Sequence, residues 1–447
     1  MANHPEIIAG LGELNRESKE MTSQFQPLQA AVISVDITPP IGVRLDGYGA
    51  RKDPSNDIHD PLFATLLVFK AGEKCVALVT LDLVAVTLEF TNRVRASISH
   101  ELGISEDSIL VSASHTHSGP AGFLGRVPIL SHVEDPVLQE ICLRRLAGAA
   151  LWCNNHFQPA RISLGRGEVH DIGRNRNDPV AGLTDYEVIV LRVDAAAGRP
   201  LAVLMNYGCH PTVLGPDNLA ISADYPGAAR LALNKIYPRT VFLFTNGATG
   251  DVSTRFTRRG QGYSEVERMG HILAGEVLKV IQIATPVDEV ALSGQIHPVH
   301  LDYRHFPSEV DAQAQLEQLE ADLAKMQSTG LPHGEIRKAV TRVEGAQAQL
   351  SMIKNYGSTS FAETQVQVLH IGPLALVAMP GEPFTRTVMD IKAQSPAQLT
   401  AVVSYANDYR GYFPDAASIS AGTYEALTSP YDESAAKLLA QAALVLL

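Results

Sequence analysis

Short runs of apolar, largely β-branched residues alternate with helical patterns along the 447-residue chain from about residue 30 onward. The apolar runs predict strands, at 31–37, 64–69, 76–81, 108–114, 161–164, 186–193, 201–207 and 240–245. Apolar positions repeating at helical spacing predict helices between them, at 89–102, 137–153, 225–236 and 264–283. Strands that alternate with helices are typical of α/β proteins, so we expect mixed β-sheets flanked by helices.

A change in composition marks one segment of the second half. Between residues 307 and 356, Glu, Gln, Ala and Lys recur at helical spacing around a turn-forming stretch at 328–332. We interpret this segment as an inserted helical hairpin. Strands are predicted again afterwards, at 364–371, 374–379 and 401–406, and an amphipathic helix from about 434. Because no linker rich in Pro, Gly or Ser divides the chain, we predict one domain over 29–447 after a polar lead-in at 1–28.

Composition and charge exclude several classes of protein. The chain is 45% hydrophobic and 19% charged, which is typical of globular proteins. Its formal net charge of −12 offers no broad basic surface, so we expect no nucleic-acid partner. The longest apolar runs are far shorter than the roughly 20 residues that span a bilayer, so we expect no integral membrane segment. The amino terminus has no basic stretch followed by an apolar one, which predicts a cytoplasmic protein.

Two histidines follow the strand predicted at 108–114. Side chains two positions apart in an extended chain point to the same side, so His115 and His117 can bind one metal ion, or one ion and its substrate. The carboxyl ends of strands are also where α/β sheets place their ligands. A histidine pair that only caps a turn would leave the same pattern, so the motif alone leaves both interpretations open.

Two more candidate ligands stand at the ends of predicted strands. His210 follows the strand at 201–207, and the proline after it biases His210 toward an extended or turn conformation. Glu382 follows the strand at 374–379 and a Pro-Gly corner. With His115 they match the three protein ligands of an open catalytic zinc site. The structural alternatives are a turn histidine and a carboxylate that complements a helix dipole.

Two further polar stretches are open to a structural interpretation. The glycine-rich segment 245–253 presents Asp251 and Ser253, but an ordinary turn with an Asx-type hydrogen bond would have the same composition. It is not a phosphate-binding loop, because the lysine of that motif is absent. In the segment 222–227, we interpret Asp224 as part of the N-cap of the following helix rather than as a catalytic group.

Short motifs spread along the chain, taken together, carry a family resemblance. They are Ile37–Pro40, Gly47–Gly49, Ile58–Leu62, Ser114–Pro120, Asn175–Arg176, His210–Pro211, Ser222–Gly227, Asn246–Ser253 and Pro380–Glu382. In this order they resemble the motifs of the neutral/alkaline ceramidase family. The resemblance covers roughly residues 30 to 447 and corresponds to the large amidase domain of that family. Its members are zinc amidohydrolases that cleave the N-acyl bond of ceramide into a fatty acid and a sphingoid base.

The resemblance implies a set of site residues. The zinc ligands that it implies are His115, His210, Glu382 and Tyr412. The catalytic groups that it implies are His117 and Arg176 beside the scissile bond, Tyr424 as a phenol that stabilises the oxyanion, and Ser253 as an essential serine.

The expected function is zinc-dependent hydrolysis of an N-acyl amide bond. Zn²⁺ would activate a water molecule, tyrosines would stabilise the oxyanion, and His117 would carry a proton to the leaving amine. Ser253 as the nucleophile is an alternative. The expected substrate is a small-molecule or amphiphilic N-acyl compound. Two other functions remain open: hydrolysis of a small soluble amide or ester unrelated to lipids, and a catalytically silent binding relative.

Overall fold

The computed structural model describes residues 27–124, 134–329, 333–356 and 360–447. The lead-in predicted at 1–28 therefore lies almost entirely outside the described residues. None of the described helices is long and apolar enough to cross a membrane.

A large mixed sheet forms the centre of the molecule. Its strands are β1 (Leu28–Asp36), β3 (Phe63–Ala71), β4 (Lys74–Leu81), β5 (Ile109–Ala113), β6 (Gln158–Glu168), β8 (Glu187–Ala195), β9 (Pro200–Tyr207), β11 (Val241–Asn246) and β13 (Thr285–Val287). Their order is β11-β9-β8-β6-β1-β3-β4-β5, and β13 pairs with β6. The two outermost pairs, β4 with β5 and β9 with β11, are parallel, while the inner pairs are antiparallel. β5 and β11 therefore form the two opposite edges of the sheet, and each runs parallel to its neighbouring strand.

A smaller sheet packs face to face on the large one. It contains β14 (Leu292–Asp302), β15 (Phe361–Ile371), β16 (Leu374–Ala378) and β18 (Leu399–Val403) in that order. Leu78 and Leu204 of the large sheet share one buried cluster with Leu376 and Val403 of the smaller sheet. The sequence did not predict β14, because this edge strand contains a proline and several exposed polar residues.

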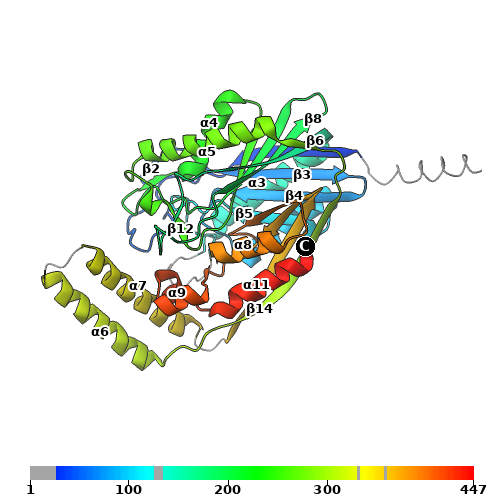
Figure 1. Ribbon diagram of the computed structural model, residues 1–447. Coiled ribbons are helices and arrows are strands. Elements are labelled where there is room, and N and C mark those ends of the chain that lie inside the picture. Colours follow the sequence, from blue (N-terminus) through cyan, green and yellow to red (C-terminus); the bar gives the residue numbers. More distant parts are fainter. Residues whose placement is uncertain (1–26, 125–133, 330–332, 357–359) are drawn as a thin grey trace, which may run out of the picture.

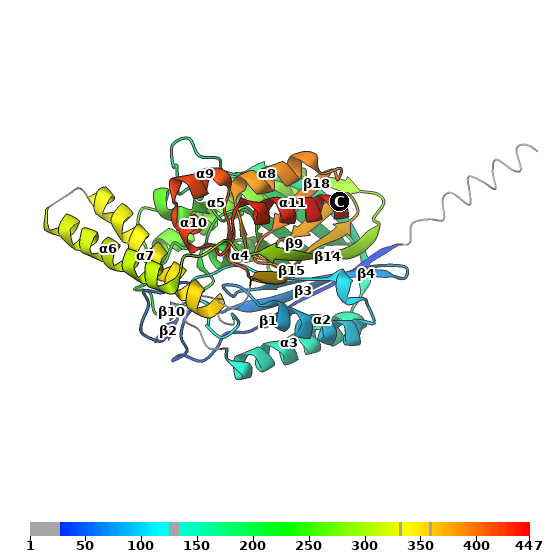
Figure 2. The same cartoon turned by 90° about the horizontal axis from the view of Figure 1, so that it is seen from below.

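Helices cover the two outer faces of the paired sheets (Figures 1 and 2). The helices on the large sheet are α2 (Leu88–Leu102) and α3 (Pro136–Asn155) over its β5 half, and α4 (Asp224–Ile236) and α5 (Tyr263–Ile283) over its β11 half. The smaller sheet is covered by α8 (Thr385–Gln394) and α11 (Glu433–Leu446). The predicted α/β class, with mixed sheets flanked by helices, is confirmed.

The predicted helical hairpin is present as α6 (Glu309–Ser328) and α7 (His333–Tyr356). The two helices pack through a small apolar cluster of Ala312, Leu316, Val343, Ala346 and Leu350. Figure 1 shows the hairpin extending from one end of the layered body. Near its base it contacts α10 (Tyr424–Thr428), where a Cβ added to Gly345 would lie 2.6 Å from Cβ of Leu427.

The start of α4 differs in detail from the prediction. The N-cap residue is Ala223, which makes no side-chain capping bond, and Asp224 is the first helical residue, with a φ of 53°. The Asp224 carboxylate instead accepts the backbone N–H groups of Tyr225 at 2.7 Å and Leu214 at 3.2 Å. Asp224 thus joins the helix start to the loop after β9, which agrees with a structural role.

Candidate active site

The site lies where strands of both sheets end. His115 follows β5, His210 follows β9, and Glu382 follows β16 in the short strand β17 (Glu382–Pro383). His115 has a φ of 68°, a left-handed conformation that is uncommon for a residue with a side chain. Its N–H donates to the Leu83 carbonyl at 2.9 Å, which anchors this conformation directly after β5. Such backbone strain is typical of functional sites.

Three imidazoles meet at this point. His115, His117 and His210 each offer one ring nitrogen, and these atoms all lie within 4.8 Å of one another. Nε2 of His117 is 3.0 Å from Nε2 of His115, and the ring centres of His115 and His210 are 4.9 Å apart. The structure therefore brings His115 and His210 together as predicted. It also places His117 among the possible ligands, in addition to the proton-carrying role expected for it.

Backbone carbonyls set the tautomers of two of these rings. Nδ1 of His115 donates to the Val84 carbonyl at 2.7 Å, and Nδ1 of His210 donates to the Val252 carbonyl at 3.0 Å. In each neutral ring Nε2 therefore presents a lone pair. Nε2 of His210 lies 3.0 Å from Oε2 of Glu382 but forms no hydrogen bond with it, because the ring donates through Nδ1 and the lone pair of Nε2 faces another acceptor. Two acceptors this close are stabilised by a cation that binds both.

The charge states suit metal binding. Burial is the main cause that lowers the pKa of His115, to about 3, and burial followed by the neighbouring imidazoles lowers the pKa of His117 well below its usual value. Burial by itself would raise the pKa of Glu382, but the adjacent His210, His115 and Arg176 outweigh it and lower that pKa to about 2. At neutral pH His115 and His117 are thus neutral and Glu382 is ionised, the forms in which these groups bind metals.

Two tyrosines that the sequence analysis missed hold Glu382 in place. The Tyr409 hydroxyl donates to Oε1 of Glu382 at 2.6 Å, and the Tyr405 hydroxyl donates to Oε2 at 3.3 Å. The Tyr405 ring also stacks on His115, with ring centres 3.7 Å apart. The available signal was their position at the end of the strand predicted at 401–406, which contains Tyr405 and precedes Tyr409. Groups of this kind orient metal ligands from outside the coordination sphere.

Tyr412, Tyr424 and Arg176 lie together beside Glu382. Tyr412 begins β19 (Tyr412–Phe413), which pairs in parallel with β17, so that Tyr412 stands opposite Glu382. The guanidinium carbon of Arg176 is 5.4 Å from the centre of the Tyr412 ring, and the Tyr412 and Tyr424 rings are 6.3 Å apart. Tyr424 is half-buried at the start of α10, so the chain after Tyr412 folds back to the site.

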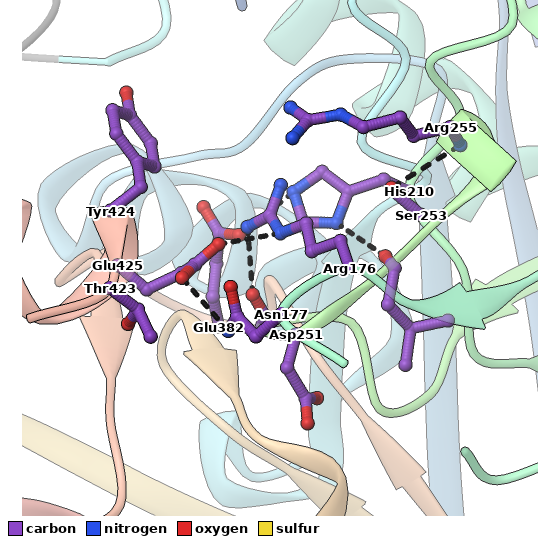
Figure 3. Close-up of polar contacts among 12 residues, drawn as sticks. Arg176, Asn177, His210, Asp251, Ser253, Arg255, Glu382, Thr423, Tyr424 and Glu425 are labelled. Atoms are coloured by element: carbon purple, nitrogen blue, oxygen red, sulfur yellow. Dashed lines mark hydrogen bonds and ion pairs between the residues drawn. The ribbon is translucent and has the colours of Figure 1, made fainter. Parts of the chain in front are cut away.

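Ser253 and Asp251 have different surroundings (Figure 3). Ser253 is buried in β12 (Val252–Ser253), where it forms a parallel bridge with His210, and its hydroxyl accepts the N–H of Arg255 at 3.4 Å. The Asp251 carboxylate accepts the N–H and the hydroxyl of Thr385, each at 2.8 Å, and the side-chain amide of Asn175 at 2.8 Å. These bonds hold Asp251 in a structural role, but they join distant segments rather than form the Asx-type turn bond expected.

The cluster fits a divalent metal such as zinc. With zinc–nitrogen bonds of about 2.0–2.1 Å, the ligand atoms of a tetrahedral site lie about 3.3 Å apart. The pairs His115–His117 and His210–Glu382 are each separated by 3.0 Å. The residues that could hold the ion are therefore these three histidines and Glu382. For Tyr412, burial followed by the nearby Glu382 raises the pKa well above its usual value, so this phenol keeps its proton when no metal is bound.

Comparison with known proteins identifies the family. Residues 29–259 match the sequence model described as "Neutral/alkaline non-lysosomal ceramidase, N-terminal". The chain belongs to this family. It is 26% identical over 222 residues to a neutral ceramidase of Oryza sativa subsp. japonica, covering 45% of this chain and 28% of that protein. It is 30% identical over 141 residues to neutral ceramidase A of Dictyostelium discoideum, covering 28% of this chain and 20% of that protein. The chain thus matches less than a third of the length of either relative.

A solved ceramidase shares the fold of this family member. The neutral ceramidase of Pseudomonas aeruginosa superposes with a TM-score of 0.72 at 18% sequence identity. The superposition covers 94% of this chain and 74% of the Pseudomonas chain.

Proposed function

We propose that this chain is a zinc-dependent amidohydrolase that cleaves an N-acyl amide bond. One observation carries the proposal: Nε2 of His210 faces the Glu382 carboxylate across 3.0 Å without a hydrogen bond, beside two further buried imidazoles. Membership of the ceramidase family supports an amide as the bond that is cleaved. A catalytically silent relative would not need to keep this set of donors.

The chain's own residues divide the chemical tasks. Bound zinc would polarise the acyl carbonyl and lower the pKa of a water molecule toward about 7. Tyr424 and Arg176 would place a hydroxyl and a positive charge where the oxyanion develops. When it is not a metal ligand, His117 would transfer a proton to the leaving amine through Nε2, which lies 3.0 Å from Nε2 of His115. Ser253, buried next to His210, is the alternative nucleophile.

The proposed substrate is a small-molecule or amphiphilic N-acyl compound, met in the cytoplasm. The names of the relatives favour ceramide-like amides, while a small soluble amide or ester is the competing substrate class. We would assay N-acyl sphingoid bases of several chain lengths beside N-acyl amino sugars, N-acyl amino acids and matched esters. Turnover of amides supports the proposal. Turnover of esters alone supports the competing hydrolase. Turnover of long-chain ceramide in detergent far above all other amides would contradict a soluble substrate.

Metal analysis tests the centre directly. We expect His115→Ala to lose zinc and activity while its circular dichroism spectrum stays that of the wild type. His271→Ala, which removes an exposed histidine of α5, is the matched control and should keep both. Full zinc occupancy in His115→Ala would refute the ligand assignment, and wild-type protein with substoichiometric zinc and no activity would support the silent relative.

A further inference from the structure

Glu425 is a buried carboxylate next to the site that no sequence motif singles out. It follows Tyr424 in the first turn of α10, and its side chain is 2% exposed. Oε1 of Glu425 lies 2.7 Å from Nε of Arg176, whose side chain is itself only 10% exposed. The other oxygen accepts the side-chain amide of Asn177 at 3.1 Å. Figure 3 shows Glu425 and Arg176 pointing toward each other, with His210 beyond Arg176.

Arg176 is held from a second side by the loop before Ser253. Its Nη2 donates to the Gly250 carbonyl at 2.7 Å, and its backbone N–H donates to the Asp251 carbonyl at 2.7 Å. A guanidinium group is planar, so the ion pair at Nε and the hydrogen bond from Nη2 together restrict the orientation of the whole group. The plane is thereby held next to the Tyr412 ring.

We infer that Glu425 is a positioning residue, which holds the Arg176 guanidinium in the orientation that the amidase site requires. The inference rests on the proposed function, because it assumes that Arg176 acts beside the scissile bond. A buried arginine without its carboxylate would turn toward solvent or toward another acceptor. The ionised Glu382 is close enough to Arg176 for each charge to affect the pKa of the other, so it is a competing acceptor of opposite charge within the site.

The helix that carries Glu425 is anchored independently of Arg176. Nη1 and Nη2 of Arg304 donate to the carbonyls of Ala426 and Leu427, each at 3.1 Å. The hydroxyl of Thr423 caps the helix by accepting the N–H of Ala426 at 3.4 Å. Gly345 of α7 packs against Leu427 from the hairpin. Glu425 is therefore presented to Arg176 by a helix that other contacts already hold.

Kinetics of substituted enzymes test the inference. We expect Glu425→Gln to lower kcat about tenfold or more with KM changed less than about threefold, because a small misplacement of a catalytic group costs rate. Asn177→Ala removes only the amide bond to Glu425 from an exposed residue, so it should lower kcat by a smaller factor. The double variant Glu425→Gln with Arg176→Lys should be no slower than Arg176→Lys alone.

Asp194→Asn is the control, since it breaks the Arg192–Asp194 pair of 2.8 Å at the far end of β8 and should leave kcat unchanged.

A spectroscopic measurement separates this inference from the proposed function. The Nε–Hε signal of Arg176 can be assigned by its loss in Arg176→Lys. Because Nε is buried in the ion pair with Glu425, this proton should exchange slowly with water in the wild type and rapidly in Glu425→Gln. Any of three results would overturn the inference. They are an unchanged exchange rate of the Arg176 signal, a kcat of Glu425→Gln within twofold of wild type, and additive losses of kcat in the double variant. Full activity of Arg176→Lys would also overturn it, and would leave the amidase proposal intact. If no amide is cleaved by the wild type, the proposed function fails, and the exchange rate still decides whether Glu425 holds Arg176.

Discussion

Gly47 lies directly against the imidazole of His117. A Cβ atom at position 47 would be 2.4 Å from Cγ and 2.5 Å from Nδ1 of His117, and the φ of Gly47 is 97°. The loop is fastened there by Arg51, whose Nη1 donates to the carbonyl of His117 at 2.8 Å and to that of Asp46 at 3.1 Å. The loop therefore cannot move away without breaking these bonds, and only a glycine leaves room for His117.

Gly47→Ala should displace His117. We expect kcat/KM to fall on the order of 100-fold, because a catalytic group misplaced by about 1 Å loses roughly that much rate. Gly42→Ala is the matched control, since Gly42 has a similar φ of 94° but open space around it. Both variants strain the backbone, so equal activities of the two would mean that contact with His117 is unimportant. Steady-state kinetics and thermal melts of the two proteins make the comparison.

Tyr409→Phe should weaken metal binding while the ligands themselves remain. The phenol donates to Oε1 of Glu382 at 2.6 Å, and loss of a group that orients a ligand typically costs about 10- to 100-fold in metal affinity. Titration of zinc into the metal-free protein measures the change. Tyr237→Phe, at a tyrosine whose hydroxyl bonds to Gln282 on the surface, should bind zinc as the wild type does. Unchanged affinity in Tyr409→Phe would show that Tyr409 does not position Glu382.

Tyr424→Phe should lower kcat and kcat/KM by similar factors. A hydroxyl that acts only on the oxyanion contributes in the transition state, so KM should hardly move. Loss of one such donor typically costs on the order of 100- to 1000-fold in kcat. The measurement requires a zinc-loaded variant with the wild-type metal content. Activity within a few-fold of wild type would leave Tyr424 with a packing role beside Tyr412.

Asp224 should make stability depend on pH. Burial raises its pKa to about 7 in the folded protein, whereas the unfolded chain titrates near 3.8. Between these values the folded state holds the proton that the unfolded state has lost. The contribution of Asp224 to the free energy of unfolding is therefore greatest below pH ~4. This contribution is lost as the pH rises through ~7.

Asp224→Asn removes that titration. Its destabilisation relative to the wild type should be larger at pH 5 than at pH 8, because only the wild type loses stability between them. Thermal or urea unfolding at both values tests this. Equal differences would show that Asp224 does not titrate in this range.

Local pattern specified the elements and the ends of strands at which His115, His210 and Glu382 stand. Periodicity reports which side chains are buried, and the predicted helices at 89–102 and 264–283 agree with α2 and α5 within about one residue. It failed for β14, because an edge strand with polar exposed positions lacks an apolar pattern.

The contacts around the metal ligands depended on tertiary structure. Packing of the two sheets brings β5 beside the chain after β18, where the N–H of Ala113 donates to the carbonyl of Tyr405 at 3.1 Å. Only this packing stacks the Tyr405 ring on His115 and brings the Tyr409 hydroxyl within hydrogen-bond distance of Glu382. Apart from their position at the end of a predicted strand, nothing local to these tyrosines marks them as partners of a ligand.

The sequence by itself thus determined the α/β class, the strand ends and the candidate ligand types, since these follow from periodicity and side-chain chemistry. Tertiary structure decided which groups surround the ligands, as the buried pair of Glu425 and Arg176 shows. The physical reason is that burial and ion pairing between segments distant in the chain depend on how sheets and helices pack, and packing leaves no periodic signal at either residue.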